Sequence, residues 1–289
     1  MIRSLPKSKR YTIIYNTYMI MFYTFLFAPL IVTCILAFNN SDFPGLPWKG
    51  FTLDWFFANT DSRVGLFHDP NILRSIWVSV ETAVIVSLLS LVVGTLGAFL
   101  FTQENFRFKQ ALYFLAISPL VIPGVILGIS ILVASNAVGG FLEKHFGIDA
   151  SFFAPGFWLV VLGQFSFITT FVVLVVSARL RKFDRTLEEA AMNLGATRFQ
   201  VIWHITLKYL RPALIGAGAV AFLMSFENFN TTLFLVGSDP TLPINLYLQV
   251  RDGSTPVINA VSFLIIVFTS TLALINLYFA NKTKRSDVA

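Results

Sequence analysis

Two acidic residues interrupt the long apolar runs of this sequence, and carboxylates in such surroundings are the side chains with the most to do chemically. Asn228 follows Glu227 directly, and at helical spacing Glu227, Asn230 and Thr231 would form a partly polar stripe beside a row of phenylalanines. An acid at the bilayer centre costs about 2.5 to 3.5 kcal/mol, so such residues usually face a cavity or a partner. We predict that Glu227, Asn228 and Asn230 line a path for a cation. The alternative is a structural carboxylate satisfied by a partner subunit.

Glu81 is the second acid of this kind. It lies near the beginning of its apolar run and close to Trp77, a residue type common at membrane interfaces. Glu81 is therefore a further candidate to line the path for a cation. The alternative is that Glu81 lies at the outer membrane interface and has no such role.

A second group of chemically informative residues lies between Arg179 and Arg211. Thr186 and Glu189 have the spacing of a capping box, and the adjacent acids Glu188 and Glu189 fall in a first helical turn, where the helix dipole favours them. Gly195 can end that helix in the left-handed conformation. The pattern predicts two short helices joined at the glycine.

The second of these helices begins with another capping-box spacing, Thr197 with Gln200. Small and apolar residues form one face of the first helix: Leu187, Ala190, Ala191 and Leu194. Such a face suits insertion into a groove of another protein. A pair of interfacial helices that merely joins two spans is the alternative. A DNA-binding helix-turn-helix conflicts with the apolar runs on both sides.

The elements that must position these residues are membrane spans. Hydrophobic residues make up 56% of the 289 residues and charged residues only 12%, against about 25% charged in soluble domains. A span needs about 20 apolar residues. Six runs qualify, and they predict an all-α integral membrane fold: Tyr18–Phe38, Ile76–Phe101, Ala111–Ser135, Phe157–Val176, Pro212–Phe234 and Val257–Phe279.

Basic residues give these spans an orientation. With both termini cytoplasmic, sixteen of the 21 lysines and arginines fall in cytoplasmic segments, as the positive-inside rule requires. The predicted organisation is a basic tail over 1–17, a six-span domain over 18–279 that contains the loop 179–211, and a second cytoplasmic tail over 280–289. The segment Asn39–Asn71 is then the longest external loop. The first span exceeds a typical signal-peptide core, which favours an uncleaved anchor.

Several classes of site are absent from the sequence. No G-x-x-x-x-G-K-[ST] loop occurs, so we expect the chain to bind no cofactor and to leave ATP and Mg²⁺ to a partner. The three histidines, His68, His145 and His204, have no metal-ligand spacing, and the single cysteine excludes an internal disulfide. No catalytic triad or paired-carboxylate site is present. We therefore expect a chain that is not itself an enzyme.

The loop also carries a family pattern. Glu189-Ala190-Ala191, then Gly195, then Ile205-Thr206-Leu207 resembles the EAA signature of permease subunits in binding-protein-dependent ABC importers. The family pattern usually has proline after the leucine, whereas this chain has Lys208, which leaves the exit geometry of the second helix open.

The resemblance covers most of the chain and is strongest to the second permease of spermidine/putrescine importers. Further shared residues include Phe106-Arg107-Phe108, Pro119, Pro123 and the segment Ser225–Phe229. It implies a MetI-like type I fold in which Glu188, Glu189, Ala190, Ala191, Gly195, Ile205 and Leu207 form the contact to the ATPase. It also implies four kinds of partner: a second permease, two ATPase subunits, an extracytoplasmic binding protein and membrane lipid, without nucleic acid.

The function that we expect is that of a permease subunit in the bacterial inner membrane, with polyamine as the first choice of substrate. Close relatives of the family carry ferric iron, thiamine, phosphonates or opines, so these remain alternatives. A channel or secondary transporter without an ATPase is the rival from another class, and the EAA spacing argues against it. No internal repeat is visible, so one chain is expected to form only half of a pathway.

Overall fold

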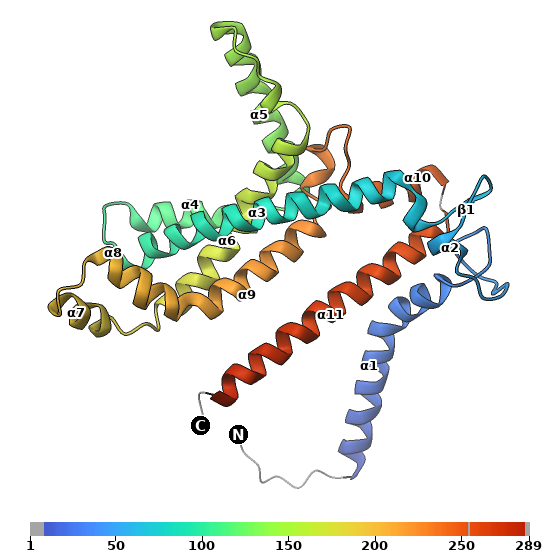
Figure 1. The fold of residues 1–289 in the computed structure, drawn as a ribbon, viewed down its shortest axis with the longest axis horizontal. Helices are drawn as coiled ribbons and strands as arrows, with labels where there is room; N and C mark the ends of the chain where they lie inside the picture. The colour runs from blue at the N-terminus through green and yellow to red at the C-terminus, as the bar shows by residue number, and fades with distance from the viewer. Residues whose placement is uncertain (1–8, 254, 287–289) are drawn as a thin grey trace. The chain divides into compact units, whose positions relative to one another are not determined.

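The computed structural model describes residues 9–253 and 255–286, with the side chains of 272–273 and 275–286 outside this description. Helices make up most of it (Figure 1). The chain forms two compact units, one made of 1–73 and 248–289 and the other of 74–247. Helices α3 (Pro70–Gln103) and α10 (Leu242–Gly253) cross from one unit into the other.

The unit 74–247 is built around α6 (Phe157–Leu180), which packs against α9 (Leu207–Phe226) and α4 (Lys109–Val121). Figure 1 shows α3, α4, α6 and α9 running together, with α7 (Thr186–Asn193) and α8 (Arg198–Val201) at one end. The remaining elements are α5 (Gly124–Phe146) and the short helices η2 (Ser151–Phe153), η3 (Ile202–Thr206) and η4 (Thr232–Phe234).

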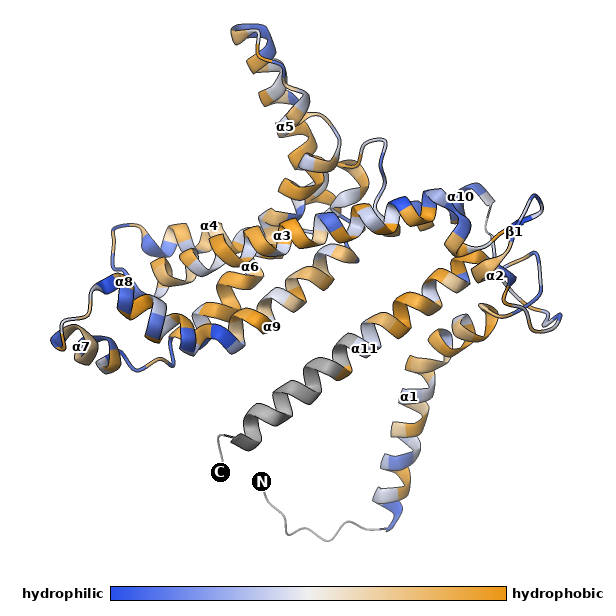
Figure 2. Cartoon of the chain, viewed as in Figure 1, coloured by the Kyte–Doolittle hydropathy of each residue, from blue (hydrophilic) through white to orange (hydrophobic). Residues whose placement is uncertain are grey.

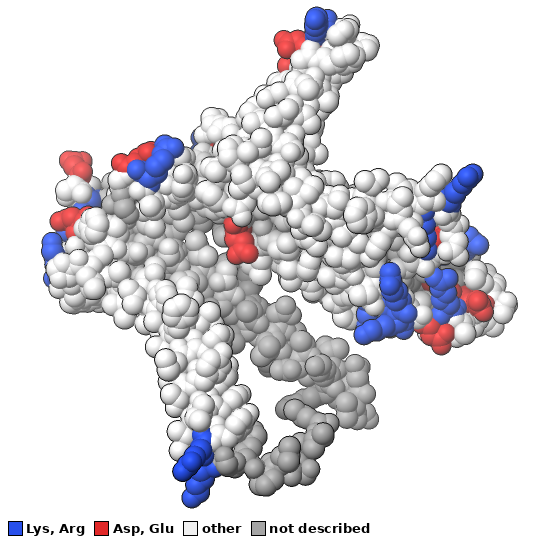
Figure 3. All heavy atoms as spheres, turned by 180° about the vertical axis from the view of Figure 1, so that it is seen from behind, with Lys and Arg blue, Asp and Glu red and all other residues white. Residues whose placement is uncertain are grey.

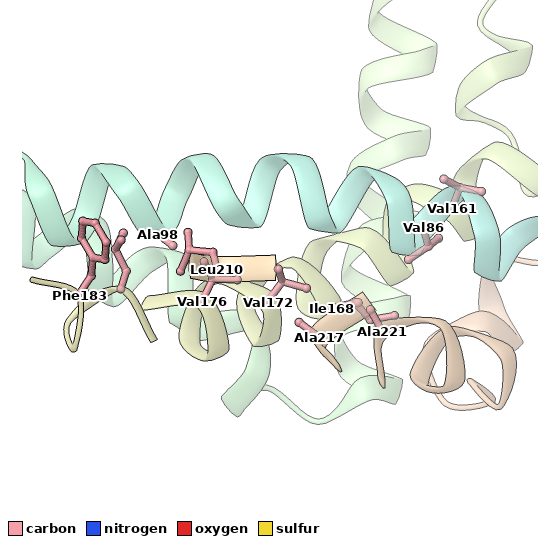
Figure 4. Close-up of a cluster of buried hydrophobic side chains, with 11 residues drawn as sticks. Val86, Ala98, Val161, Ile168, Val172, Val176, Phe183, Leu210, Ala217 and Ala221 are labelled. Atoms are coloured by element: carbon pink, nitrogen blue, oxygen red, sulfur yellow. The ribbon is translucent and has the colours of Figure 1, made fainter. Parts of the chain in front are cut away.

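Buried aliphatic side chains hold α3, α6 and α9 together (Figure 4). Val86 and Ala98 come from α3, Ile168 and Val172 from α6, and Leu210 from α9. All five are completely buried. Buried residues occur along most of the length of α6. A helix that is apolar on all sides suits the centre of a bundle.

Close contact between α3 and α6 depends on a glycine. A Cβ atom at Gly94 would lie 2.7 Å from Cβ of Val172, which is closer than real Cβ contacts allow. Small residues at helix crossings let backbones approach in membrane proteins, where van der Waals packing takes the place of a hydrophobic driving force. The sequence of α3 thus specifies this crossing at a single residue.

The other unit contains α1 (Lys9–Leu36), which packs on α11 (Val257–Ser286), and the loop that follows α1. This loop is ordered by small elements: α2 (Asp54–Phe57), the antiparallel pair β1 (Asn59–Thr60) and β2 (Arg63–Val64), and η1 (Leu66–His68). The Asn39 side chain donates to two backbone carbonyls of the loop, and Arg63 bridges Asp42 and Asp54. The loop therefore contains two short helices, α2 and η1.

Figure 2 shows that the long helices are largely apolar. Several of them nevertheless begin or end at other residues than the predicted spans. Five helices among the described residues are long and apolar enough to cross a membrane, and the described part of α11 adds a shorter apolar stretch over Val257–Thr271. The predicted span Ala111–Ser135 is wrong as one helix, because it is divided into α4 and α5 at Pro123. Proline lacks an N–H and disfavours helical backbone at the preceding residue.

The ends of the first, fifth and last spans also differ. Helix α1 begins at Lys9 and α11 continues to Ser286, so neither 17 nor 280 is a helix boundary. The predicted span Pro212–Phe234 is wrong at both ends: helix continues from Arg198 through η3, a π-helical turn, and stops at Phe226. Lys208 is compatible with this continuous helix because it keeps the backbone N–H that the family proline would lack, and Pro212 lies within α9 without ending it.

Candidate functional site

Two interruptions of helical structure meet inside the unit 74–247. One lies between α4 and α5 at Ile122 and Pro123, and the other begins where α9 ends at Phe226. The segment after α9 packs against α5, where a Cβ at Gly128 would lie only 2.6 Å from the Thr231 carbonyl oxygen. Irregular backbone at membrane depth is tolerated where it is buried in protein or lines a water-filled cavity. This pair of breaks, with the segment 227–231, is the candidate translocation site.

A buried polar network fixes the segment 227–231 to α6. The Gln164 side chain is completely buried; its Nε2 donates to Thr232 Oγ1 over 2.8 Å, and its Oε1 accepts from the Ser225 hydroxyl. Thr232 Oγ1 in turn donates to Asn228 Oδ1 over 2.9 Å. Because a polar group in an apolar interior is costly unless it is hydrogen-bonded, this closed network defines the loop's position.

Asn228 is therefore partly committed to structure, whereas Glu227 and Asn230 are exposed. Glu227 is the residue that ends α9, and its N–H still donates to the Leu223 carbonyl. The prediction that Glu227, Asn230 and Thr231 lie along one helix is wrong, because no helix continues there. Their proximity in the segment 227–231 comes from a loop instead.

The end of α9 concentrates negative potential at Glu227. A helix carries about half a negative elementary charge at its C-terminus from its unpaired carbonyls, and the carboxylate adds to it. A cation near this point would meet both. Glu81 lies on α3 and is also exposed. On the face seen in Figure 3, one acidic group stands apart amid uncharged surface, whereas the other charged side chains lie toward the edges of the view.

Helices α7 and α8 have the geometry that the loop pattern predicted, with one correction. Gly195 has a φ of +91°, its N–H donates to the Met192 carbonyl, and the Ala196 N–H reaches the Ala191 carbonyl. These two bonds form a Schellman motif, which explains the glycine. Thr197 and Gln200 form the predicted capping box.

The capping box predicted for Thr186 and Glu189 is not formed. Asp184 takes that place instead: its carboxylate accepts from both the N–H and the hydroxyl of Thr186. These hydrogen bonds stabilise the ionised form and hold the pKa of the Asp184 carboxyl below its usual value. Glu189 is thereby left exposed in the first turn of α7.

The other residues expected at the ATPase contact divide into two groups. Ala190 is exposed and Ala191 half-buried, and they lie near Leu187 and Leu194, whose side chains are 51% and 90% exposed. Glu188 points back into the protein, where its Oε1 accepts from the buried Thr206 hydroxyl over 2.5 Å. Two further residues of the pattern, Ile205 and Leu207, are half-buried on the continuous helix.

Sequence reasoning did not single out Gln164 or Thr232, and it named Ser225 only as the first residue of the shared segment Ser225–Phe229, although these three residues carry the network. A signal was available for Gln164, because it is the one amide within the apolar run Phe157–Val176 and intramembrane polar residues are functional or partnered by default. Its partners lie more than sixty residues away. Gln164 and its partners come together because α9 ends at Phe226. The continuous apolar run in the sequence did not indicate that end.

Comparison with known proteins agrees with this architecture. Residues 90–285 match the family model of the binding-protein-dependent transport system inner membrane component. The putrescine transport system permease protein PotI of Escherichia coli K12 is 31% identical over 92% of this chain and 90% of its own length. The spermidine/putrescine transport system permease protein PotC of Haemophilus influenzae is 27% identical over 92% of this chain and 96% of its own length.

Solved structures show the same fold at lower identity. A bacterial ABC transporter involved in the import of alginate has a TM-score of 0.73 at 21% identity, with 96% of both chains covered. The MetNI methionine ABC transporter has a TM-score of 0.53 at 16% identity, covering 74% of this chain and 95% of the other. The predicted MetI-like fold is confirmed. The chain belongs to the binding-protein-dependent transport system inner membrane component family and is a multi-pass permease subunit of an ABC importer.

Proposed function

We propose that this chain forms part of the translocation pathway of a polyamine importer whose ATP hydrolysis takes place on separate subunits. The observation that carries the proposal is the exposed Glu227 at the broken end of α9, within a loop held by buried hydrogen bonds. A polyamine is a flexible cation, and a carboxylate beside a helix C-terminus favours cations. The printed names of the relatives PotI and PotC, which concern putrescine and spermidine, support the same substrate class.

The helix α7 is the proposed contact to an ATPase subunit. Exposed Leu187 in α7 and Leu194 directly after it offer apolar surface to a groove, and Glu189 offers charge at the helix start. The Schellman motif at Gly195 fixes the direction in which the chain leaves α7, so a push on α7 reaches α8 and the continuous helix to Phe226. This continuous helical segment ends at Phe226, next to Glu227, so it connects the proposed ATPase contact to the proposed path.

The remaining partners follow from the importer class. We expect a second permease, two ATPase subunits and an extracytoplasmic binding protein, with both termini of this chain in the cytoplasm. Two solved relatives have names that mention an ABC transporter, one of them in complex with a periplasmic protein bound to alginate pentasaccharide. ATP and Mg²⁺ are assigned to the ATPase subunits.

Substrate competition in cells tests the substrate class. A strain without other polyamine importers should take up labelled putrescine only when this chain and its partners are expressed. Unlabelled spermidine should compete, whereas thiamine, phosphonate and ferric chelates should not. Competition by one of these three, without competition by spermidine, would replace polyamine by that substrate.

A further inference from the structure

An apolar groove runs along one side of α3 in the unit 74–247. Its volume is about 760 Å³, within the range of about 300–1,000 Å³ for small-molecule sites. Leu91, Thr95 and Phe99 follow one another at helical spacing along α3, and Trp203 and Leu214 form the opposite wall. The groove is open to its surroundings, since Leu96 and Trp203 are 64% and 59% exposed.

The length of the groove matches one leaflet of a membrane. Its lining on α3 extends from Leu91 to Gln103, which at a rise of about 1.5 Å per residue is roughly 18 Å. One leaflet is half of the hydrocarbon core of about 30 Å. An acyl chain that begins at Gln103 would therefore reach the region of the bilayer midplane near Leu91.

A polar pocket of about 250 Å³ continues the groove at its Gln103 end. The two hollows share Gln103, Glu104 and Ile202. Arg185 and Arg198 line the polar pocket, together with the carboxylates of Glu104 and Glu188. Guanidinium groups are the preferred donors to phosphate oxygens, and a carboxylate accepts hydrogen bonds from a primary ammonium.

Gln103 lies at the junction and has an unsatisfied donor. Its Nε2 is buried and has no hydrogen-bond partner among the residues that the structure describes. A buried N–H donor without a hydrogen bond costs free energy. The ester or phosphate oxygen of a lipid at the junction would accept a hydrogen bond from this donor. Arg185 already donates to the Thr102 carbonyl, so one side of its guanidinium is fixed toward α3.

We infer that the groove and the polar pocket together bind one phospholipid with a primary ammonium head group, of the phosphatidylethanolamine type. An acyl chain fills the groove, Arg185 and Arg198 hold the phosphodiester, and Glu104 receives the ammonium. The pocket's two arginines are matched by two glutamates, which favours this zwitterion over a purely anionic head group. The lipid contacts Met192 of α7, so it supports the proposed coupling helix from the membrane side.

Native mass spectrometry tests this site on the purified full-length chain. The chain is released from bilayers that contain phosphatidylethanolamine, phosphatidylglycerol and phosphatidylcholine with matched acyl chains. The wild type should retain phosphatidylethanolamine preferentially. Arg198→Gln should reduce this preference roughly tenfold, equivalent to about 1.4 kcal/mol. Arg181→Gln removes the same charge from an exposed position outside both hollows, and it should bind as the wild type does.

A second variant probes the groove without touching the arginines. Leu96→Trp places a large ring in the groove and should displace the lipid, with circular dichroism confirming that the helices are intact. Equal retention of the three lipids by the wild type would overturn the assignment. So would equal preference in the Arg198→Gln and Arg181→Gln variants, or full retention by a folded Leu96→Trp variant.

Discussion

At the residue scale, the most consequential side chains are those that end or anchor the broken helix. Gln164 and Thr232 are completely buried and hydrogen-bonded to each other, so their role is to hold the segment 227–231. Glu227 has a different position, exposed at the end of α9. This contrast separates the structural polar groups from the proposed cation-binding group.

The charge of Glu227 should matter more than its size. Glu227→Gln keeps the shape and removes the attraction for a cation, which between unit charges about 4 Å apart is about 4 kcal/mol at an effective dielectric constant of 20. We expect putrescine uptake to fall at least about tenfold in the glutamine variant and less in Glu227→Asp. Assembly with the ATPase subunits, followed by co-purification, should be unchanged in both. Normal uptake by an assembled Glu227→Gln importer would make this residue structural.

The sequence indicates Glu81, Glu227 and the residues of the loop 179–211 as candidates. It predicts how these residues are arranged only in part. Apolar length and composition are local properties, so they located the membrane helices. The end of α9 at Phe226 depends on hydrogen bonds from Gln164 to residues far along the chain, and no local pattern contains them. Asp184, and not Thr186, is the side-chain acceptor at the start of α7. Both residue types can accept a hydrogen bond from a nearby backbone N–H, so only the folded backbone decides which of the two does so.

At the element scale, the contact between α5 and the segment 227–231 requires a glycine. A Cβ at Gly128 would meet the Thr231 carbonyl oxygen at 2.6 Å, and a backbone atom cannot move aside as a flexible side chain does. Gly128→Ala should therefore shift the segment and reduce uptake severalfold. Gly140→Ala lies on the same helix with nothing within 4 Å of the added methyl group, so its uptake should match the wild type. Equal uptake in the two variants would show that transport does not depend on this contact.

The turn between α7 and α8 should be essential for coupling. Gly195→Pro forces φ to about −65° where the chain needs +91° and removes the N–H that bonds Met192. Glu189→Lys inverts the charge at the start of α7. Both should abolish the stimulation of ATPase activity by loaded binding protein while membrane insertion persists.

A helical glycine provides the control for the turn variants. Gly216→Ala adds a methyl group in open space on α9 and should leave stimulation intact. If Gly195→Pro and Glu189→Lys also retain normal stimulation, this loop has no part in coupling.

At the scale of the whole molecule, the charge distribution predicts the orientation. The loop 179–211 should face the cytoplasm and the segment 39–71 the outside. After Cys34 is replaced, a single cysteine at Ser62 or Thr197 reports the side, because both residues are exposed. An impermeant thiol reagent applied to intact cells should label only the first. Labelling of the second alone would invert the topology.

The most direct test of the account is ATP-dependent uptake of putrescine into proteoliposomes. They should contain this chain with its second permease and ATPase subunits, ATP inside, and binding protein outside. We predict putrescine accumulation that requires both ATP and binding protein, and that falls at least about tenfold with Glu227→Gln. Uptake that proceeds without ATP, or an assembled importer that hydrolyses ATP on addition of loaded binding protein but moves no polyamine, would contradict the central claim.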